Sequence, residues 1–380
     1  MNKKIAWLRI LSFFLALFSV ISLHAQQEHL IIGTYTGTGS KGIYVYKFNA
    51  KTGKAEWLNN SDSVTNPSYV TLSPNGKFLY AVNETHGDDP GKVSAFRYDN
   101  RTGSITFLNR QISGGDDPCY VAVSPDGKWV AVANYTSGSA ALFPVNADGT
   151  LKPHAQLIQD KGSSVNKARQ ESAHVHETVF TPDHKFLVTP DLGMDQLKVY
   201  RYNPHAAQPL TPANPPYVPQ LPGSGPRHIT FTPDHRHAYL IHELNGTVYA
   251  YAYHEGKFML LQRIITHPKD FKGTLGSAEV QVSPDGRFLY ASNRGDENTI
   301  TIFSIAPGGT LKLVGYQSVY GVMQRNFIID PSGNFLLVAN QMSDNIVIFR
   351  VNKKTGLLKK VDPEIHIPKP VCLQLVAPGK

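Results

Sequence analysis

Residues 283–295 read SPDGRFLYASNRG, and this stretch decides the fold because the chain repeats it. Near-copies are SPNGKFLYAVNET at 73–85, SPDGKWVAVANYT at 124–136 and DPSGNFLLVANQM at 330–342. Each copy has a tight turn followed by a strand-like run of apolar residues that ends at Asn. The frame is constant, whereas the residue after the Asn changes, as Glu84, Tyr135, Arg294 and Gln341. A constant frame with one variable position indicates a repeated scaffold that carries a site.

The spacing of the repeat is typical of propeller blades. The turn prolines are 51, 57, 51, 51 and 47 residues apart, at Pro74, Pro125, Pro182, Pro233, Pro284 and Pro331. Self-similarity at this period indicates a propeller or a solenoid. Each unit contains four short strand-like segments separated by Gly, Asn and Asp turns, and in the first unit these are residues 67–73, 77–83, 92–99 and 104–110.

The seventh unit is divided between the two ends of the chain. Residues 370–379, PVCLQLVAPG, supply only an inner strand, and three further strands lie within residues 29–60. A closed ring explains this division, because joining the ends removes exposed strand edges. We therefore predict an all-β fold, a seven-bladed β-propeller of four-stranded antiparallel blades, closed by a C-terminal strand that completes the N-terminal blade.

The N-terminus resembles a secretory signal peptide. Lys3, Lys4 and Arg9 precede an apolar run over residues 10–23, and LHA ends at Ala25. A transmembrane anchor is the alternative, but the run is short for a membrane span. We predict a signal peptide over residues 1–25, a single propeller domain over 26–380, a periplasmic or secreted location, and no stable membrane insertion after cleavage.

Charge and motifs limit the class of function. Removal of residues 1–25 lowers the formal net charge from +8 to +5, and no Lys/Arg-rich run is present. Nucleic-acid binding is therefore not indicated, whereas a small anionic ligand suits this charge. The sequence contains no G-x-S-x-G, H-E-x-x-H, P-loop or dinucleotide fingerprint. We expect no cofactor and no bound metal, and the sequence carries no signal for an oligomeric state.

The repeat register predicts which residues surround one mouth of the channel. The first two strands of a blade are antiparallel, so the start of strand one lies beside the end of strand two. The starts are Ser68, Cys119, His176, Arg227, Ala278, Arg325 and Cys372. The ends are Asn83, Asn134, Asp191, His242, Asn293 and Asn340, each followed by a variable residue. Cys119 and Cys372 take equivalent positions with a blade between them, which predicts two free thiols.

Histidines and arginines at these positions are the candidate functional groups. His174 and His176 have strand spacing and project to the same side, as a metal pair, an acid/base or substrate-binding pair, or a structural pair. Arg227, Arg294 and Arg325 are candidate anion ligands, because guanidinium groups bind carboxylate or phosphate with two parallel hydrogen bonds. His228 follows Arg227 and is a candidate substrate contact.

Carboxylates and amides complete the predicted site. Glu243 either neutralises Arg227 or acts as a general base. Asp191 either accepts hydrogen bonds from backbone amides or takes part in catalysis. Asn293 is expected to be mainly structural, with some polar ligand contact, and His242 is a candidate substrate contact.

The chain resembles a family, the seven-bladed propeller lactonases, which includes propeller-type 6-phosphogluconolactonases and a fungal carboxy-muconate lactonizing enzyme. The resemblance covers residues 29–380. It rests on GTYTGTGSKGIYVY, NPSYVTLSPNGKFLYAVNE, VANYTSGSAALFPVNADGTL, QESAHVHETVFTPD, PDLGMDQLKVY, GPRHITFTPD, SPDGRFLYASNRG and RNFIIDPSGNFLLVANQMSDNIVIF.

The resemblance implies an active site at the mouth, with His176 (or His174), Arg227, Glu243 and Arg294 as catalytic residues. The family more often has Asn at the position of His242 and Pro at that of Gln324, and export is a further departure. The expected activity is metal-independent hydrolysis of an anionic sugar lactone, 6-phosphogluconolactone-like or unphosphorylated. Either Glu243 or His176 would activate water. The alternatives are a muconate-type lactonizing enzyme or cycloisomerase, and a non-catalytic periplasmic ligand-binding propeller.

Overall fold

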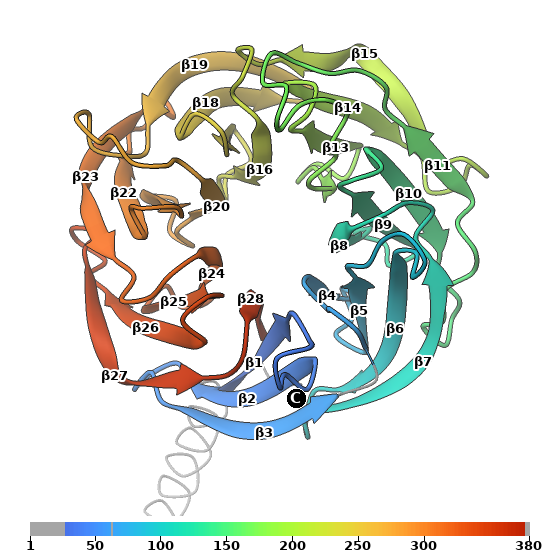
Figure 1. Cartoon of the computed structure of the whole chain (residues 1–380), viewed down its shortest axis with the longest axis horizontal. Helices are drawn as coiled ribbons and strands as arrows, with labels where there is room; N and C mark the ends of the chain where they lie inside the picture. The colour runs from blue at the N-terminus through green and yellow to red at the C-terminus, as the bar shows by residue number, and fades with distance from the viewer. Residues whose placement is uncertain (1–26, 62–63, 377–380) are drawn as a thin grey trace, which may run out of the picture.

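Seven four-stranded antiparallel sheets form a closed ring (Figure 1). This computed structural model describes residues 27–61 and 64–376. The predicted signal peptide lies outside the described residues. Within the described ranges every regular element is a strand, and no helix is long and apolar enough to cross a membrane. The predicted seven-bladed propeller is confirmed.

The blades follow one another in chain order around the ring, each running from an inner to an outer strand. The closing blade contains β28 (Pro370–Val376), β1 (Gln27–Thr34), β2 (Ile43–Asn49) and β3 (Ala55–Ser61). The next two contain β4 (Val70–Leu72), β5 (Phe78–Asn83), β6 (Lys92–Asp99) and β7 (Ser104–Ile112), and β8 (Pro118–Val123), β9 (Trp129–Asn134), β10 (Ser139–Pro144) and β11 (Gln156–Gln159).

The remaining four blades repeat this order. They are β12 (Val179–Phe180), β13 (Phe186–Asp191), β14 (Gln196–Tyr202) and β15 (Leu210–Pro219); β16 (Pro226–Phe231), β17 (His237–His242), β18 (Thr247–His254) and β19 (Lys257–Ile265); β20 (Ser277–Val282), β21 (Phe288–Asn293), β22 (Thr299–Ile305) and β23 (Leu311–Ser318); and β24 (Gln324–Ile329), β25 (Phe335–Asn340), β26 (Asn345–Val351) and β27 (Leu358–His366).

The ring closes between the two ends of the chain. β28 pairs antiparallel with β1, from His29 opposite Val376 to Thr34 opposite Pro370. Its side chains at Val371, Cys372 and Leu373 are almost fully buried. The C-terminal strand therefore completes the N-terminal blade, as the divided repeat predicts, and pairs the edge of β1 that faces the channel.

The hydrophobic core lies between the faces of neighbouring blades. Tyr80, Tyr239 and Tyr290 each donate a hydroxyl hydrogen bond to a glycine carbonyl in the hairpin of the next blade. Gly149, one of these glycines, has φ +87°, and a Cβ atom there would come within 2.1 Å of Phe78. The repeated Gly turns therefore allow the blades to pack closely.

The Asn residue that recurs at the end of strand two also has a structural role. Asn83, Asn134, Asn293 and Asn340 are buried, and each side-chain amide donates to a backbone carbonyl in the loop that leads into strand one. These hydrogen bonds join the end of strand two to the chain arriving from the preceding blade. The prediction that the Asn ring is mainly structural is confirmed.

In several blades a β-bulge at the start of strand one leaves one residue without a pairing partner. In β8, β16 and β24 the residue without a pairing partner is Cys119, Arg227 and Arg325, respectively. Bulges commonly redirect side chains beside active sites. In β28 the corresponding residue is Val371, because Pro370 pairs with Thr34 and Cys372 with Gly33. The predicted equivalence of Cys119 and Cys372 is therefore wrong by one residue, although both thiols are free and buried.

Candidate active site

A cavity of about 370 Å³ opens at one mouth of the channel. Its lining contains five charged side chains and comes from most of the blades. The lining residues are Glu84, Cys119, Tyr135, Arg169, His176, Glu243, Thr274, Leu275, Gly276, Arg294, Gly295, Met323 and Arg325. Other hollows lie between neighbouring Pro-containing turns, and because they recur from blade to blade they belong to the scaffold. The mouth cavity is where the variable positions of the repeat converge.

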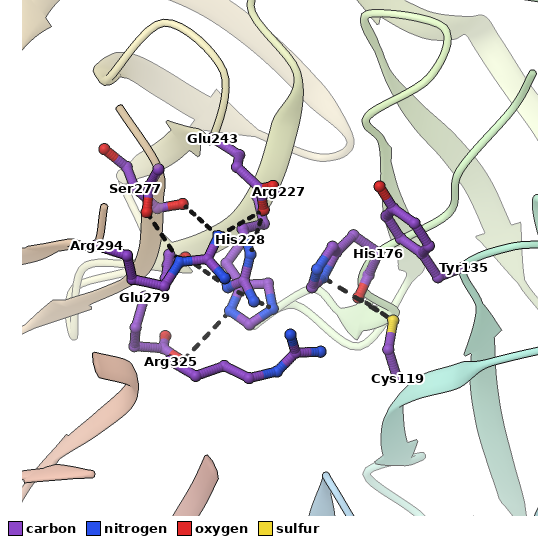
Figure 2. A network of polar contacts seen from close by, with 12 residues as sticks. Cys119, Tyr135, His176, Arg227, His228, Glu243, Ser277, Glu279, Arg294 and Arg325 are labelled. Carbon is purple, nitrogen blue, oxygen red and sulfur yellow. Dashed lines mark hydrogen bonds and ion pairs between the residues drawn. The ribbon is translucent and has the colours of Figure 1, made fainter. Parts of the chain in front are cut away.

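Three arginines surround Glu243 on one wall of this cavity, and Figure 2 shows two of them, Arg227 and Arg294. Arg169 Nη2 lies 2.6 Å from its Oε1, while Arg227 Nε and Arg294 Nη2 lie 3.0 and 2.8 Å from its Oε2. Burial alone would raise the pKa of this carboxyl, but the three guanidinium groups hold the pKa well below its usual range. Glu243 is therefore a firmly ionised counter-ion whose basicity is strongly reduced.

Arg227 forms the buried part of this cluster. Its side chain is 1% exposed, and it also donates from Nη1 to the carbonyl of Ala278 at 2.7 Å. Burial, together with the nearby Arg294, lowers the pKa of Arg227 to about 10, so the guanidinium stays charged at neutral pH. Arg294 is more accessible and is oriented by a 2.9 Å hydrogen bond from its Nε to the carbonyl of Gly276. Fixed partners on both sides hold these two groups in place.

His176 precedes β12, in the blade next to the one that carries Glu243, and faces the cavity, as Figure 2 shows. Its Nδ1 is 4.0 Å from Cys119 Sγ, and its ring meets those of Tyr135 and His228 edge to face. In the described part of the chain no hydrogen bond reaches its Nε2. Burial and then Arg227 lower the pKa of His176 well below 6.5. The imidazole is therefore neutral at pH 7 and has a ring nitrogen available to a ligand.

A second carboxylate lies on the opposite wall. Glu84 accepts a 2.7 Å hydrogen bond from Tyr35 OH and another from Ser68 Oγ, and Arg325 Nη2 lies 3.5 Å from its Oε2. The Arg325 guanidinium also stacks over the ring of Tyr35, 5.6 Å from its centre. β5 and β17, whose ends carry Glu84 and Glu243, lie three blades apart in the ring of seven. The cavity thus has one carboxylate–arginine group on each side.

A deeper layer of polar groups lies beneath the cavity. A pocket of about 10 Å³, comparable to one water-sized probe, is lined by Tyr69, Cys119, His176, Arg227, His228, Arg325, Asn326 and Val371. His228 Nδ1 is 3.3 Å from Glu279 Oε2. Burial and Arg227 lower the pKa of His228 to about 4, so it is neutral at physiological pH. His228 therefore supports the floor of the site and does not line the main cavity.

Four of the predicted substrate contacts lie away from the cavity. His174 stacks on Tyr135 and contacts Glu171. Asp191 is fully buried and accepts hydrogen bonds from the backbone amides of His174 and Met194. The expectation that Asp191 or His174 contacts substrate is therefore not supported by the geometry, because both ring nitrogens of His174 have protein partners and Asp191 is fully buried.

Asn293 and His242 also lie outside the lining of the cavity. Asn293 makes only framework hydrogen bonds, and His242 packs on Tyr249 with its Nε2 3.1 Å from Gln220 Oε1. Burial lowers the pKa of His242 to about 3, so it is a neutral core residue. Gln324 is also buried and bonds the backbone of the preceding blade. The two departures from the family pattern, at 242 and 324, thus lie outside the cavity.

The sequence-based site omitted several residues that line the cavity. Arg169 comes from the long loop at 160–172, and the conformation of this loop cannot be read from the repeat. Glu84 and Tyr135 occupy the variable position after the Asn, so the repeat itself contained a signal for them. Among residues 27–61 and 64–376 no three His, Cys, Asp or Glu side chains converge as a metal-ligand group, so the His174–His176 metal pair has no third ligand.

The fold and the cavity define a class of protein, a closed β-propeller with a charged ligand pocket at one mouth. The sequence matches the family described as "Lactonase, 7-bladed beta-propeller" over residues 29–375. The chain therefore belongs to the seven-bladed β-propeller lactonase family.

Individual relatives agree with this assignment. A curated protein named 6-phosphogluconolactonase from Formosa agariphila is 40% identical over 349 residues, which cover 91% of this chain and 99% of the relative. One of the same name from Bacillus subtilis is 34% identical over 348 residues, covering 91% and 97%. The solved structure of a periplasmic gluconolactonase from Pseudomonas aeruginosa matches with a TM-score of 0.88 at 38% identity, covering 93% of this chain and all of that one.

Proposed function

We propose that the protein is an exported lactonase that hydrolyses a sugar lactone to its hydroxy acid at the mouth cavity. The observation that carries the proposal is the convergence of a neutral imidazole, His176, with the arginine group around Glu243 in one cavity of about 370 Å³. A proton acceptor and fixed positive charge are the two requirements for attack of water on an ester carbonyl. The names of the relatives support the same reaction.

His176 is the residue that activates water in this proposal. Its Nε2 is available, whereas both oxygens of Glu243 are engaged by guanidinium groups. Water attacks the lactone carbonyl carbon as His176 takes its proton, and the ring C–O bond then breaks. The imidazolium returns the proton to the ring oxygen, which becomes the hydroxyl of the product. Nearby arginines disfavour the imidazolium, but the oxyanion that forms at the same time compensates for part of this cost.

The arginines stabilise the charge that develops on the carbonyl oxygen. Arg294 lines the cavity, and its guanidinium is held by Gly276 and Glu243. A donor that is already oriented needs no reorganisation during the reaction, which is the main advantage of this kind of site. Glu243 keeps Arg227, Arg294 and Arg169 together without taking up the proton. The chain supplies both base and oxyanion donors, and the proposed reaction therefore runs without a metal ion.

Location and substrate charge are parts of the same proposal. The composition of residues 1–25 supports export, and so does the periplasmic location in the name of the P. aeruginosa structure. The cavity residues Arg169, Arg294 and Arg325 outnumber Glu84 and Glu243, which favours a lactone that carries an anionic group. Phosphate or carboxylate satisfies this condition.

A panel of lactones tests the proposal. The purified chain lacking residues 1–25 is assayed by pH-stat with 6-phosphogluconolactone, glucono-1,5-lactone and muconolactone, each corrected for spontaneous hydrolysis. Proton release well above the background with a sugar lactone is the expected result. Conversion of muconolactone alone would establish the lactonizing alternative, and no turnover of any lactone would leave a ligand-binding propeller.

A further inference from the structure

The wall of the cavity opposite Glu243 is a built site with no role in the chemistry described above. Glu84 lies there with 15% of its side chain exposed to the cavity, held by Tyr35, Ser68 and Arg325. We infer that Glu84 is a specificity-determining residue that accepts hydrogen bonds from the ring hydroxyls of the substrate. This inference rests on the proposed lactonase function and names the class of lactone, a polyhydroxylated one.

Glu84 and Glu243 differ in how many further hydrogen bonds each carboxylate can accept. Both oxygens of Glu243 are taken by charged donors, three guanidinium groups within 3.0 Å. Glu84 receives two neutral hydroxyl donors and one more distant guanidinium, at 3.5 Å. A carboxylate has about four acceptor positions. Glu84 therefore has free lone pairs that face the cavity, and its orientation is fixed before a ligand binds.

The support around Glu84 comes from three different blades. Tyr35 follows β1, Ser68 and Glu84 flank β4 and β5, and Arg325 is the bulge residue of β24. The backbone of Glu84 is also tied down, because its amide donates to the carbonyl of Asn66 at 3.1 Å and its carbonyl accepts from Asn66 Nδ2 at 3.1 Å. The backbone and the carboxylate of Glu84 are therefore both held by hydrogen bonds. A carboxylate fixed in this way beside a cavity is suited to binding hydroxyl groups at defined positions.

The chemistry of the Glu84 carboxylate indicates which part of the ligand lies against it. An ionised carboxylate accepts hydrogen bonds from hydroxyl groups and repels other anions, so this wall suits the polyol part of a lactone. The anionic group, where present, must point toward the arginine-rich wall. A site built to bind a hydroxyl discriminates strongly against analogues that lack it, because its polar groups are then left unpaired. Lactones without ring hydroxyls should therefore be poor substrates.

Two pairs of compounds test the inference. Turnover is measured with glucono-1,5-lactone and with δ-valerolactone, which has the same ring and no hydroxyl groups. Binding is measured by calorimetry with the corresponding lactams, which do not hydrolyse readily. Glu84→Gln should raise KM for gluconolactone and the Kd of its lactam by about tenfold to a hundredfold, with kcat and the hydroxyl-free compounds changed little. Glu84→Asp, which keeps the charge but retracts it, should give an intermediate effect.

Glu171→Gln is the matched control, because Glu171 is an exposed carboxylate near the mouth that does not line the cavity. It should leave both compound pairs unchanged. Equal losses for hydroxylated and hydroxyl-free compounds in Glu84→Gln would show a merely structural role, and unchanged lactam binding would also overturn the inference. Absence of lactone turnover in the unmodified protein would refute the proposed function, whereas Glu84-dependent lactam binding would still support the specificity role.

Discussion

Asn293 and Arg294 are neighbours at the end of β21, and the structure predicts opposite effects when each is changed. Asn293 is buried within the frame, where its side chain donates to the carbonyl of Thr266 and to Thr301 Oγ1 and accepts from the hydroxyls of Thr266 and Ser277. Arg294 points into the cavity, 2.8 Å from Glu243. One position should therefore control stability and the other catalysis.

The structure gives the size of each effect. Asn293→Ala removes five side-chain hydrogen bonds, the longest of them 3.5 Å to Thr299 Oγ1, and leaves buried partners, which should cost about 3 kcal/mol of unfolding free energy. With an unfolding entropy near 2.1 cal/mol/K per residue, this lowers Tm by about 4 °C for a domain of this length. Arg294→Lys loses the Nε hydrogen bond to Gly276, about 1 kcal/mol or about 1.5 °C. Its loss of an oriented oxyanion donor should lower kcat by about 10² or more.

The assay combines a thermal melt with lactone kinetics on both variants, measured well below either melting temperature. Asn293→Ala should keep most of its kcat, and Arg294→Lys should keep its melting transition. The assignment of the two side chains is refuted if Arg294→Lys is fully active while Asn293→Ala melts normally and is inactive.

Three further predictions follow from the charged groups and the ring closure. Glu243→Gln should lower both kcat and Tm, because three guanidinium groups lose their shared counter-ion; inactivity with an unchanged melting curve would instead make Glu243 the general base. Deletion of residues 369–380 removes β28 and exposes strand edges, so the cooperative melt should disappear, and an unchanged transition would contradict ring closure. Stability should also fall as the pH drops from about 6.5 toward 4, because His228, like His176 and His242, stays neutral in the fold but binds a proton when unfolded. The share due to His228, about 3 kcal/mol, is measured by urea denaturation as the difference in pH dependence between the unmodified protein and His228→Gln, and an equal pH dependence in both would contradict this origin.

The fold was predictable because the repeat contains most of the information. A spacing near 50 residues, four strand-like segments per unit and a divided seventh unit together define a closed ring. Of the three arginines that the register predicts at one mouth, Arg294 and Arg325 line the cavity, and Arg227 lies buried against Glu243. The position of Val371 could not be read in this way, because Pro370 lies eight residues before the turn proline Pro378, whereas Pro118 and Pro226 lie seven residues before theirs. Local pairing decides that one-residue difference.

The composition of the site was only partly predictable. Arg169 reaches Glu243 from a long loop, and loop conformation does not follow from the blade register. His242 has the residue type of a functional group, yet tertiary packing against Tyr249 and Gln220 makes it part of the core. The role of Glu243 depends on how many cations surround it, and this number becomes known only when segments from two blades and a loop are brought together.

The pH dependence of kcat/KM, measured for the unmodified protein and for His176→Asn on the preferred lactone, tests the central claim most directly. The pKa of His176 is lowered well below 6.5, so the neutral base is fully populated at pH 7. The profile should be flat from about pH 6.5 to 8 and fall only at lower pH, and His176→Asn should lose about 10² to 10⁴ of the rate together with that acidic limb. A profile still rising through pH 7, or an active His176→Asn with the same acidic limb, would contradict the assignment of His176 as the base.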